Sequence, residues 1–300
     1  MGRTLKRSVA LSALLLGVSL GMIGPAPCTA SLADELTADK VLGLMRSQGN
    51  WEEEDAYVTF FMAEKNKEQA KWVARRLRKH YRITEDISTK MLLIFLHPRT
   101  NYKDAYLSWR YNEISKPNID WIYSDDIRRI IRLNYHEDEN FLTRYRLLYG
   151  TDFTYGDILE RNLDRDNHKI LRKEILNNKE CFVIESTPRK DISINQGDPY
   201  GKRISWIWKD NWLLLRMEHY DGKGKLIKTL HNHWKKIQGF WTLTQSLMKD
   251  QHKDHLTIIA TDDVRYNTKI VDSFFLPSNL QVAAEFYTQR EKESSDEPPH

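Results

Sequence analysis

Few residues of this 300-residue chain have the types and spacing that metal or catalytic chemistry needs. His231 and His233 stand two apart on an expected strand, which places both imidazoles on one face, as zinc ligands can lie. His252 and His255 could join them, but no cysteine pair or acidic residue stands at ligand spacing. The pattern therefore favours a solvated strand face, and we predict no metal site.

Catalytic candidates are equally sparse. Cys181 begins an apolar run ending at Ile184, where a thiol is usually buried and inert. Asp152 and Asp157 are the carboxylates that an enzyme acting on envelope lipids or glycans would use. The chain has no G-x-S-x-G, H-E-x-x-H, Walker A or G-x-G-x-x-G motif. We therefore predict a non-enzymatic protein without a cofactor, and keep the lipid- or glycan-modifying enzyme as an alternative.

A basic run follows Trp72: Arg75, Arg76, Arg78, Lys79 and Arg82. On a strand, Arg76, Arg78, His80 and Arg82 would share one face. This face is expected to be solvated, or else to dock on an acidic membrane surface or a protein partner. The chain has 46 basic and 42 acidic residues, and three of the basic ones lie in residues 1–33. The remainder carries 43 against 42, which argues against nucleic acid as a partner.

Residues 1–33 have the three parts of a cleavable export signal. The basic, apolar and small-residue parts are Arg3 with Lys6 and Arg7, Val9–Ile23, and Gly24–Ala33. Cleavage is expected after Ala30 or Ala33. Pro27 precedes Cys28, where a lipid-attachment site needs a small residue, so Cys28 is expected to be lost with the signal. We predict an exported protein.

One helix and about ten strands are expected in a single domain over residues 34–285. Ala38, Val41, Leu42 and Met45 have helical spacing after Thr37, a suitable N-cap. The apolar period then changes to two, and Asp221–Gly224 is a typical hairpin turn. Residues 286–300 are expected to be a disordered tail.

Residues 135–167 interrupt this strand pattern with a polar and irregular stretch. Such segments are often lids. The lid residues that we predict are Phe141, Leu142, Leu147 and Leu148.

Aromatic residues are concentrated in the expected strands. Ordinary core packing explains them, and so does a large apolar cavity on the concave face of a curled sheet. On the second interpretation, the ligand-binding residues are Phe60, Met62, Phe95, Trp109, Trp121, Trp206, Trp208, Leu213, Leu215 and Met217.

Eight short runs, in order from about residue 36 to 277, resemble the LolA-like outer-membrane lipoprotein-sorting family of periplasmic proteins. They are Leu92–Pro98, Tyr106–Trp109, Trp121–Tyr123, Ile127–Ile130, Gly150–Tyr155, Cys181–Pro188, Tyr220–Leu226 and Asp263–Asn267. Each run alone is weak, whereas the set in this order is specific. No single acyl-binding residue can be carried over from the family by motif.

The resemblance implies a mainly β fold: an incomplete antiparallel β-barrel with covering helices on its concave apolar side. It also implies a periplasmic carrier of lipid or lipid-modified protein toward the outer membrane of a Gram-negative envelope. An inner-membrane transporter of the RND (resistance-nodulation-division) type is an implied partner, and a non-catalytic adaptor of such a transporter is the alternative function. Burying a sixteen-carbon chain is worth on the order of 12 kcal/mol, so free passage of such a chain through water is slow. A protein cavity lowers this barrier by burial alone and needs no catalytic residue.

Overall fold

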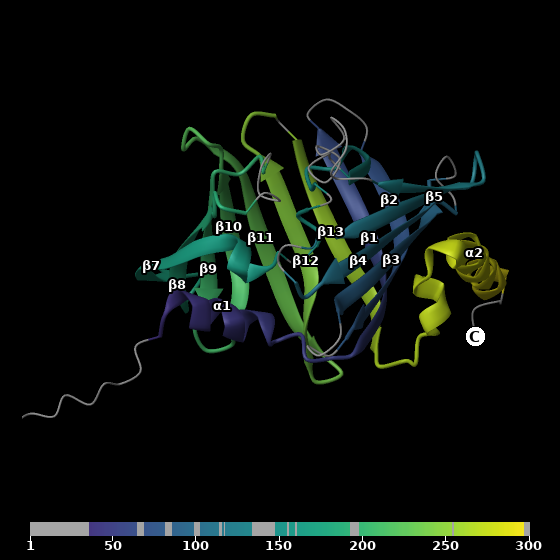
Figure 1. The fold of residues 1–300 in the computed structure, drawn as a ribbon, viewed down its shortest axis with the longest axis horizontal. Coiled ribbons are helices and arrows are strands. Elements are labelled where there is room, and N and C mark those ends of the chain that lie inside the picture. The colour runs from purple at the N-terminus through teal and green to yellow at the C-terminus, as the bar shows by residue number, and fades with distance from the viewer. Residues whose placement is uncertain are drawn as a thin grey trace, which may run out of the picture. The chain divides into compact units, whose positions relative to one another are not determined.

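The computed structural model describes residues 36–64, 69–81, 86–98, 103–113, 116, 118–133, 148–154, 156–159, 161–192, 198–253 and 255–296. Within these residues, thirteen strands form one antiparallel sheet (Figure 1). Their order is β6-β5-β4-β3-β2-β1-β13-β12-β11-β10-β9-β8-β7, so β6 and β7 are its edges. The sheet is open and is not closed into a barrel.

The strands follow the chain in sequence order, so most pairs are hairpin neighbours. Six strands come first: β1 (Glu53–Glu64), β2 (Ala70–His80), β3 (Ile87–His97), β4 (Ala105–Tyr111), β5 (Ile119–Ser124) and β6 (Arg129–Leu133). Seven follow: β7 (Asp166–Leu176), β8 (Lys179–Pro188), β9 (Lys202–Trp208), β10 (Leu213–Tyr220), β11 (Leu226–Ile237), β12 (Phe240–Asp250) and β13 (His255–Tyr266). The pairing of β1 with β13 joins the two halves.

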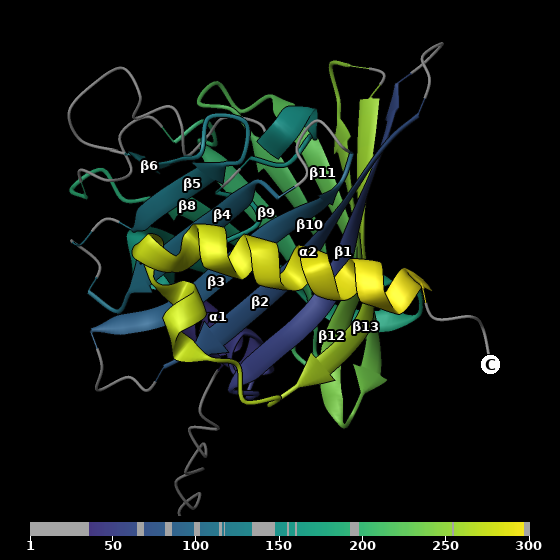
Figure 2. The same ribbon diagram turned by 90° about the vertical axis from the view of Figure 1, so that its right-hand side faces the viewer.

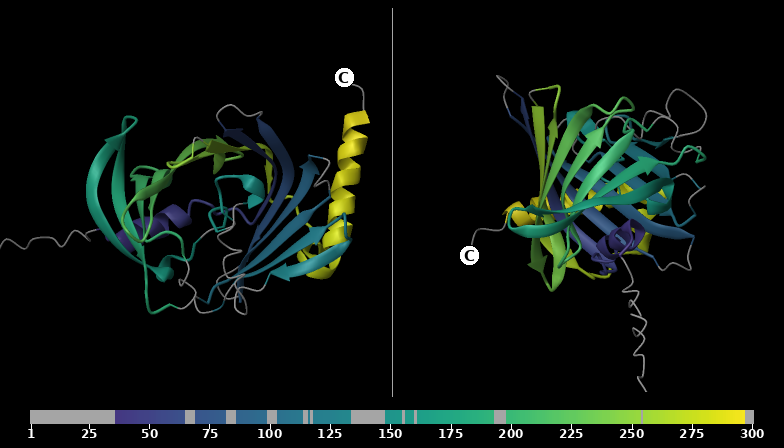
Figure 3. Two further views of the ribbon diagram at one scale, coloured as in Figure 1. Left: turned by 90° about the horizontal axis from the view of Figure 1, so that it is seen from above. Right: turned by 90° about the vertical axis from the view of Figure 1, so that its left-hand side faces the viewer.

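The two faces of the sheet bury different clusters. Figure 3 shows the sheet curving around α1, with α2 outside the curve. On β3, Leu93 and Phe95 face inward, whereas the alternating Leu92 and Ile94 pack outward. We call these the concave and the convex face. Because β3 is apolar on both faces, both must be covered.

Helix α1 (Ala38–Arg46) lies on the concave face. The hydroxyl of Thr37 accepts a hydrogen bond from the Lys40 backbone N–H at 3.3 Å and caps the helix. Val41 and Leu42 are buried against Phe182 and other residues of β8 and β9. The N-cap and the apolar spacing expected from the sequence are therefore confirmed.

Helix α2 (Leu280–Asp296) covers the convex face of β2–β5 (Figure 2). Two short 3₁₀ helices lead into it, η6 (Asp272–Phe275) and η7 (Pro277–Asn279). Leu280, Ala283 and Ala284 are fully buried. The expected disordered tail over 286–300 differs from the structure, in which α2 continues to Asp296 and Tyr287 packs in the cluster of this face.

The mainly β, open antiparallel fold expected from the sequence is confirmed. The hairpin at Asp221–Gly224 is also confirmed: the Asp221 carboxylate accepts the backbone N–H groups of Lys223 and Lys225 at 2.9 and 2.8 Å. Strand β6 was not expected. The export signal and the lid residues Phe141, Leu142 and Leu147 lie outside the described residues.

Candidate functional site

The concave face carries two apolar clusters, one on β8 and β9 beneath α1 and one across β12, β13 and β1–β4. The register places Ile184, Ser205, Met217, Leu230 and Met248 in one row across β8–β12. The row continues through Thr257 to Met62 on β1. One half of this surface lies on β12, β13 and β1–β4. Its buried residues are Val58, Phe60, Ala74, Met91, Leu93, Phe95, Tyr106, Met248 and Ile259.

A segment of the chain itself covers this half of the surface; it is described at residues 148–154 and 156–159, and we call it the loop 148–159. Leu148, Phe153 and Leu159 are 1%, 3% and 7% exposed and belong to the same cluster as Phe60 and Phe95. The segment begins with the 3₁₀ helix η3 (Leu148–Gly150). A second 3₁₀ helix, η4 (Leu163–Arg165), follows it and leads into β7. The apolar surface is therefore filled by side chains of a loop, without a second sheet.

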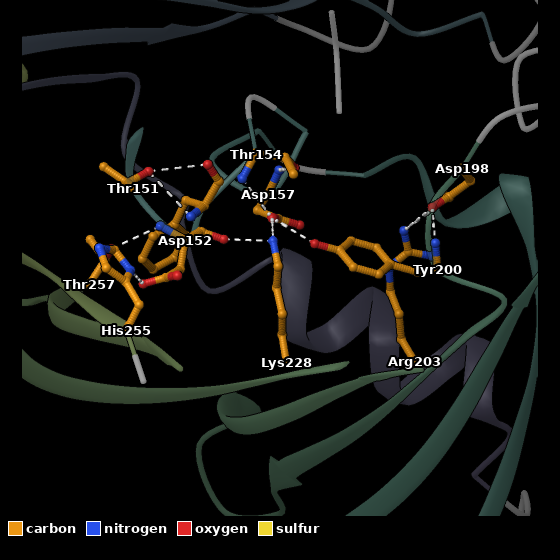
Figure 4. Close-up of polar contacts among 11 residues, drawn as sticks. Thr151, Asp152, Thr154, Asp157, Asp198, Tyr200, Arg203, Lys228, His255 and Thr257 are labelled. Carbon is orange, nitrogen blue, oxygen red and sulfur yellow. Dashed lines mark hydrogen bonds and ion pairs between the residues drawn. The ribbon is translucent and has the colours of Figure 1, made fainter. Parts of the chain in front are cut away.

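Asp152 anchors the segment to β13 and β11 (Figure 4). Its carboxylate accepts from His255 Nδ1 at 2.6 Å and from the Thr257 hydroxyl at 2.8 Å. Its backbone N–H donates to the same hydroxyl at 2.8 Å. Lys228 Nζ donates to its carbonyl oxygen at 2.6 Å. Four bonds thus hold one residue of the loop against the sheet.

Asp157 makes the second anchor. Its Oδ2 accepts from the Thr154 N–H at 2.8 Å and from the Tyr200 hydroxyl at 2.9 Å, and Lys228 Nζ lies 3.9 Å away. The Asp157 N–H in turn donates to the Thr154 hydroxyl at 3.1 Å, a capping-box exchange. Burial raises the pKa of the Asp157 carboxyl. At the acidic pH where this carboxyl titrates, the positive charges of His219 and Lys228 and the hydrogen bonds from Thr154 outweigh burial, so the net pKa is lowered.

His219 lies close to the second anchor, Asp157, and is 3% exposed. It stands opposite Arg203 and Lys228 in the register of β9–β11, and its ring centroid is 4.4 Å from that of Tyr200. Among the described residues, neither of its nitrogens has a hydrogen-bond partner. Burial and the charges of Arg203 and Lys228 lower the pKa of His219 to about 4, although Asp157 opposes this. The imidazole is therefore neutral at pH 7.

Arg203 completes the polar group. Its Nη2 donates to both carboxylate oxygens of Asp198, at 3.0 and 2.9 Å. Its Nη1 is buried and has no partner among the described residues. Gly201, next to Tyr200, lets the backbone approach Asp221 closely. A Cβ at this position would lie 2.6 Å from the Asp221 carbonyl oxygen, so a larger residue would not fit without a shift. A close backbone contact thus positions the phenol that bonds Asp157.

The structure divides the ten expected ligand-binding residues between the two faces. Phe60, Met62, Phe95 and Met217 lie on the concave face, and of the expected lid residues Leu148 covers it. The other six lie on the convex face: Trp109, Trp121, Trp206, Trp208, Leu213 and Leu215. The face assignment of these six is corrected.

Two local features explain the correction. A bulge between Leu214 and Arg216 reverses the alternation on β10, so that Leu213 and Met217 face opposite sides. Trp109 and Trp121 pack against each other beneath η6, where the Trp109 indole N–H donates to the Phe275 carbonyl oxygen at 2.8 Å. A shift of one residue in register moves a whole strand to the other face.

The basic run on β2 is not a solvated face. Arg76 and Arg78 donate to Glu54, which is 1% exposed, and Arg75 donates to Asp55. Burial raises the pKa of Glu54, but the two arginines outweigh it and hold that pKa at about 2. The sequence signal was the acidic run of residues 52–55, which stands opposite the basic run in the β1–β2 register.

Metal and membrane features are limited in the described part of the chain. His231 and His233 are exposed on β11. No group of three or more histidine, cysteine or acidic side chains is arranged to hold a metal ion within the described ranges. Likewise, no helix there is both long and apolar enough to cross a bilayer.

Solved structures of other proteins share the fold of this chain. A putative outer membrane lipoprotein-sorting protein domain from Vibrio parahaemolyticus matches with a TM-score of 0.70 and 22% identity, over 81% of this chain and 97% of that chain. A LolA superfamily protein from Nitrosomonas europaea matches with a TM-score of 0.61 and 18% identity, over 80% and 98%. The open sheet is therefore a LolA-like fold.

The family follows from a second pair of matches. A DUF1329 family protein from Desulfovibrio piger matches with a TM-score of 0.71 and 22% identity, over 81% of this chain and 98% of that chain. A family model described as that of an uncharacterized protein matches residues 88–282, more than half of the chain. No curated protein sequence matches significantly. The chain belongs to the family that this model describes, and it shares the fold of the DUF1329 protein.

Proposed function

We propose that this protein is a periplasmic carrier that binds the acyl chains of a lipid or a lipid-modified protein on its concave face for transport toward the outer membrane. The observation that carries the proposal is the apolar concave face, which the loop 148–159 covers in place of a second sheet. A loop with few backbone pairings can move away from a sheet at lower cost than a strand can. The LolA-like fold supports the same role.

The proposed role is non-enzymatic. Asp152 and Asp157, the two candidate catalytic carboxylates, are buried in the network that anchors the loop. Asp152 accepts from His255 and Thr257, and Asp157 accepts from Thr154 and Tyr200. This arrangement supports a positioning role for both.

The proposal includes export through the signal over residues 1–33 and an RND-type transporter as the inner-membrane partner, both from the sequence analysis. Amino-terminal sequencing of periplasmic material is expected to start near Ser31 or Asp34. A chain that keeps Met1, or a lipid on Cys28, would contradict this part of the proposal.

The binding test uses delipidated protein and N-phenyl-1-naphthylamine, a neutral probe that fluoresces in apolar surroundings. We expect saturable binding to the wild type. Met217→Glu should weaken binding at least tenfold, because it places a charge on the concave face. Leu247→Glu is the matched control, since Leu247 is also half-buried but alternates with the concave Met248 on β12.

Two results would contradict the carrier. One is a wild type that neither binds the probe nor retains lipid when purified from the periplasm and examined by native mass spectrometry. The other is an equal loss of binding in Met217→Glu and Leu247→Glu, with unchanged unfolding curves, which would place the probe elsewhere.

A further inference from the structure

The carboxylates of the loop 148–159 occupy a receptor made by the sheet. Lys228, His255 and Thr257 project from β11 and β13, and Tyr200 lies just before β9 (Figure 4). All of them offer nitrogen or hydroxyl groups to Asp152 or Asp157 at the distances given above. The sheet thus supplies the donors and the loop supplies the oxyanions.

His219 shows that this receptor has capacity that the loop does not use. A buried imidazole without a partner costs free energy, so such groups in folded proteins usually have a ligand or a water. Both ring nitrogens of His219 are unpartnered among the described residues, and so is the Arg203 Nη1 on the adjacent strand. Among the described residues, the loop therefore satisfies neither the His219 nitrogens nor the Arg203 Nη1.

The receptor adjoins the apolar surface directly. His219 is two residues from Met217 on β10, and Lys228 is two residues from Leu230 on β11, so each pair shares the concave face. The loop reproduces the same combination, because buried apolar Phe153 follows Asp152 and precedes Asp157 in the chain. Side chains of the loop therefore form an apolar body with oxyanionic groups.

We infer that the loop 148–159 imitates the ligand, and that the ligand is an acyl amphiphile carrying an oxyanion, a carboxylate or a phosphate, which Lys228, Tyr200, His219 and Arg203 bind when the loop is displaced. This inference rests on the proposed carrier function. It adds the class of cargo: acyl chains joined to an anionic group are preferred over neutral acyl compounds of the same length.

The test compares three sixteen-carbon competitors of the bound neutral probe: hexadecyl phosphate, palmitate and hexadecanol, each below its critical micelle concentration. We expect both anions to displace the probe at concentrations at least tenfold lower than the alcohol, which is about 1.4 kcal/mol. Inorganic phosphate alone should not displace the probe, because the acyl chain of a ligand supplies most of its affinity.

Two variants with opposite expectations guard against misfolding. Lys228→Met should reduce the preference for anions to less than twofold and leave hexadecanol unaffected. Asp157→Asn should strengthen the binding of hexadecyl phosphate about tenfold, because Lys228 and Tyr200 lose the oxyanion that competes with it. Asp55→Asn is the matched control: it alters a buried aspartate–arginine pair beneath α2, so affinities should stay within twofold.

The outcomes separate the inference from the carrier function. Equal displacement by all three competitors overturns the inference and leaves the carrier intact. Displacement by inorganic phosphate overturns the amphiphile as the ligand class. An unchanged affinity of Asp157→Asn for hexadecyl phosphate also overturns the inference, since the loop would then not compete with the ligand. If the probe does not bind at all, the carrier proposal itself fails.

Discussion

One sheet carries two covers, and the covers differ in chemistry. Helix α2 contacts the convex face through Leu280, Ala283 and Ala284. It is a regular α-helix, so its backbone groups are paired within the helix. The loop 148–159 meets the concave face with two aspartates as well as apolar side chains. A polar ligand cannot take the place of an apolar contact. It can take the place of a carboxylate in an ion pair or a hydrogen bond. We infer from this difference that α2 belongs to the core and that the loop 148–159 is the cover that a ligand can displace.

The largest expected effect tests the permanent cover. Ala283→Asp should lower the free energy of unfolding by about 4 kcal/mol, because it buries a carboxylate without a partner. Val282→Asp on the same helix should change it by less than about 0.5 kcal/mol, since Val282 is 56% exposed. Urea denaturation of both variants measures the contrast. Similar stabilities would mean that α2 is not held on the sheet.

The second prediction concerns pH and the exchangeable cover. In the unfolded chain the pKa of a histidine is near 6.5, and in the folded chain the pKa of His219 is about 4. Between these values only the unfolded chain binds the proton, so stability falls as the pH drops from 6.5 to 4. At 1.36 kcal/mol per unit, this loss is about 3 kcal/mol.

Urea denaturation at pH 7 and pH 4.5 measures the loss, with His219→Gln as the variant that should remove it. On the convex face, α2 contributes the buried phenol of Tyr287. Burial raises the pKa of Tyr287 to about 12, so the phenol stays neutral throughout this pH range. The same pH dependence in the wild type and in His219→Gln would show that His219 is protonated in the folded state.

A matched pair of leucines gives the third prediction. Leu280→Ala in α2 should cost about 3 kcal/mol, and Leu159→Ala in the loop about 2 kcal/mol, because a loop can relax into the space that is left. Leu159→Ala should also bind the neutral probe more tightly, since less apolar surface must be displaced. Denaturation and probe titration measure both effects. A larger cost at Leu159 than at Leu280 would reverse the assignment of the two covers.

The sequence predicts the strands well because their evidence is local. Period-two apolar patterns, Thr37 before a helical repeat, and Asp221-Gly222 in a turn each act within a few residues. It fails at α2, because the charged residues after Arg290 suggest a tail. The spacing of Leu280, Ala283, Ala284 and Tyr287 at i, i+3, i+4 and i+7 carried the helix signal.

The site was predictable only in part, because its partners are distant in sequence. Asp152 and Asp157 stood out by position, but Tyr200 is 43 residues from Asp157, and Lys228 is 76 from Asp152. The faces of the aromatic residues depend on the bulge on β10, which no local pattern marks. Contacts at this range follow from the register of the whole sheet.

The smallest expected effect concerns a third region, the convex cluster around Cys181, which no helix of the described residues covers. Cys181 is fully buried with Val183 and Trp206, and burial raises the pKa of its thiol. A buried thiol with little thiolate reacts slowly, so a polar thiol reagent at pH 7 should label it no faster than the protein unfolds. Labelling in denaturing urea, followed by mass spectrometry, is the control for reagent activity. Rapid labelling of the native protein would mean that the convex face also opens locally, so that displacement would not be confined to the face covered by the loop 148–159.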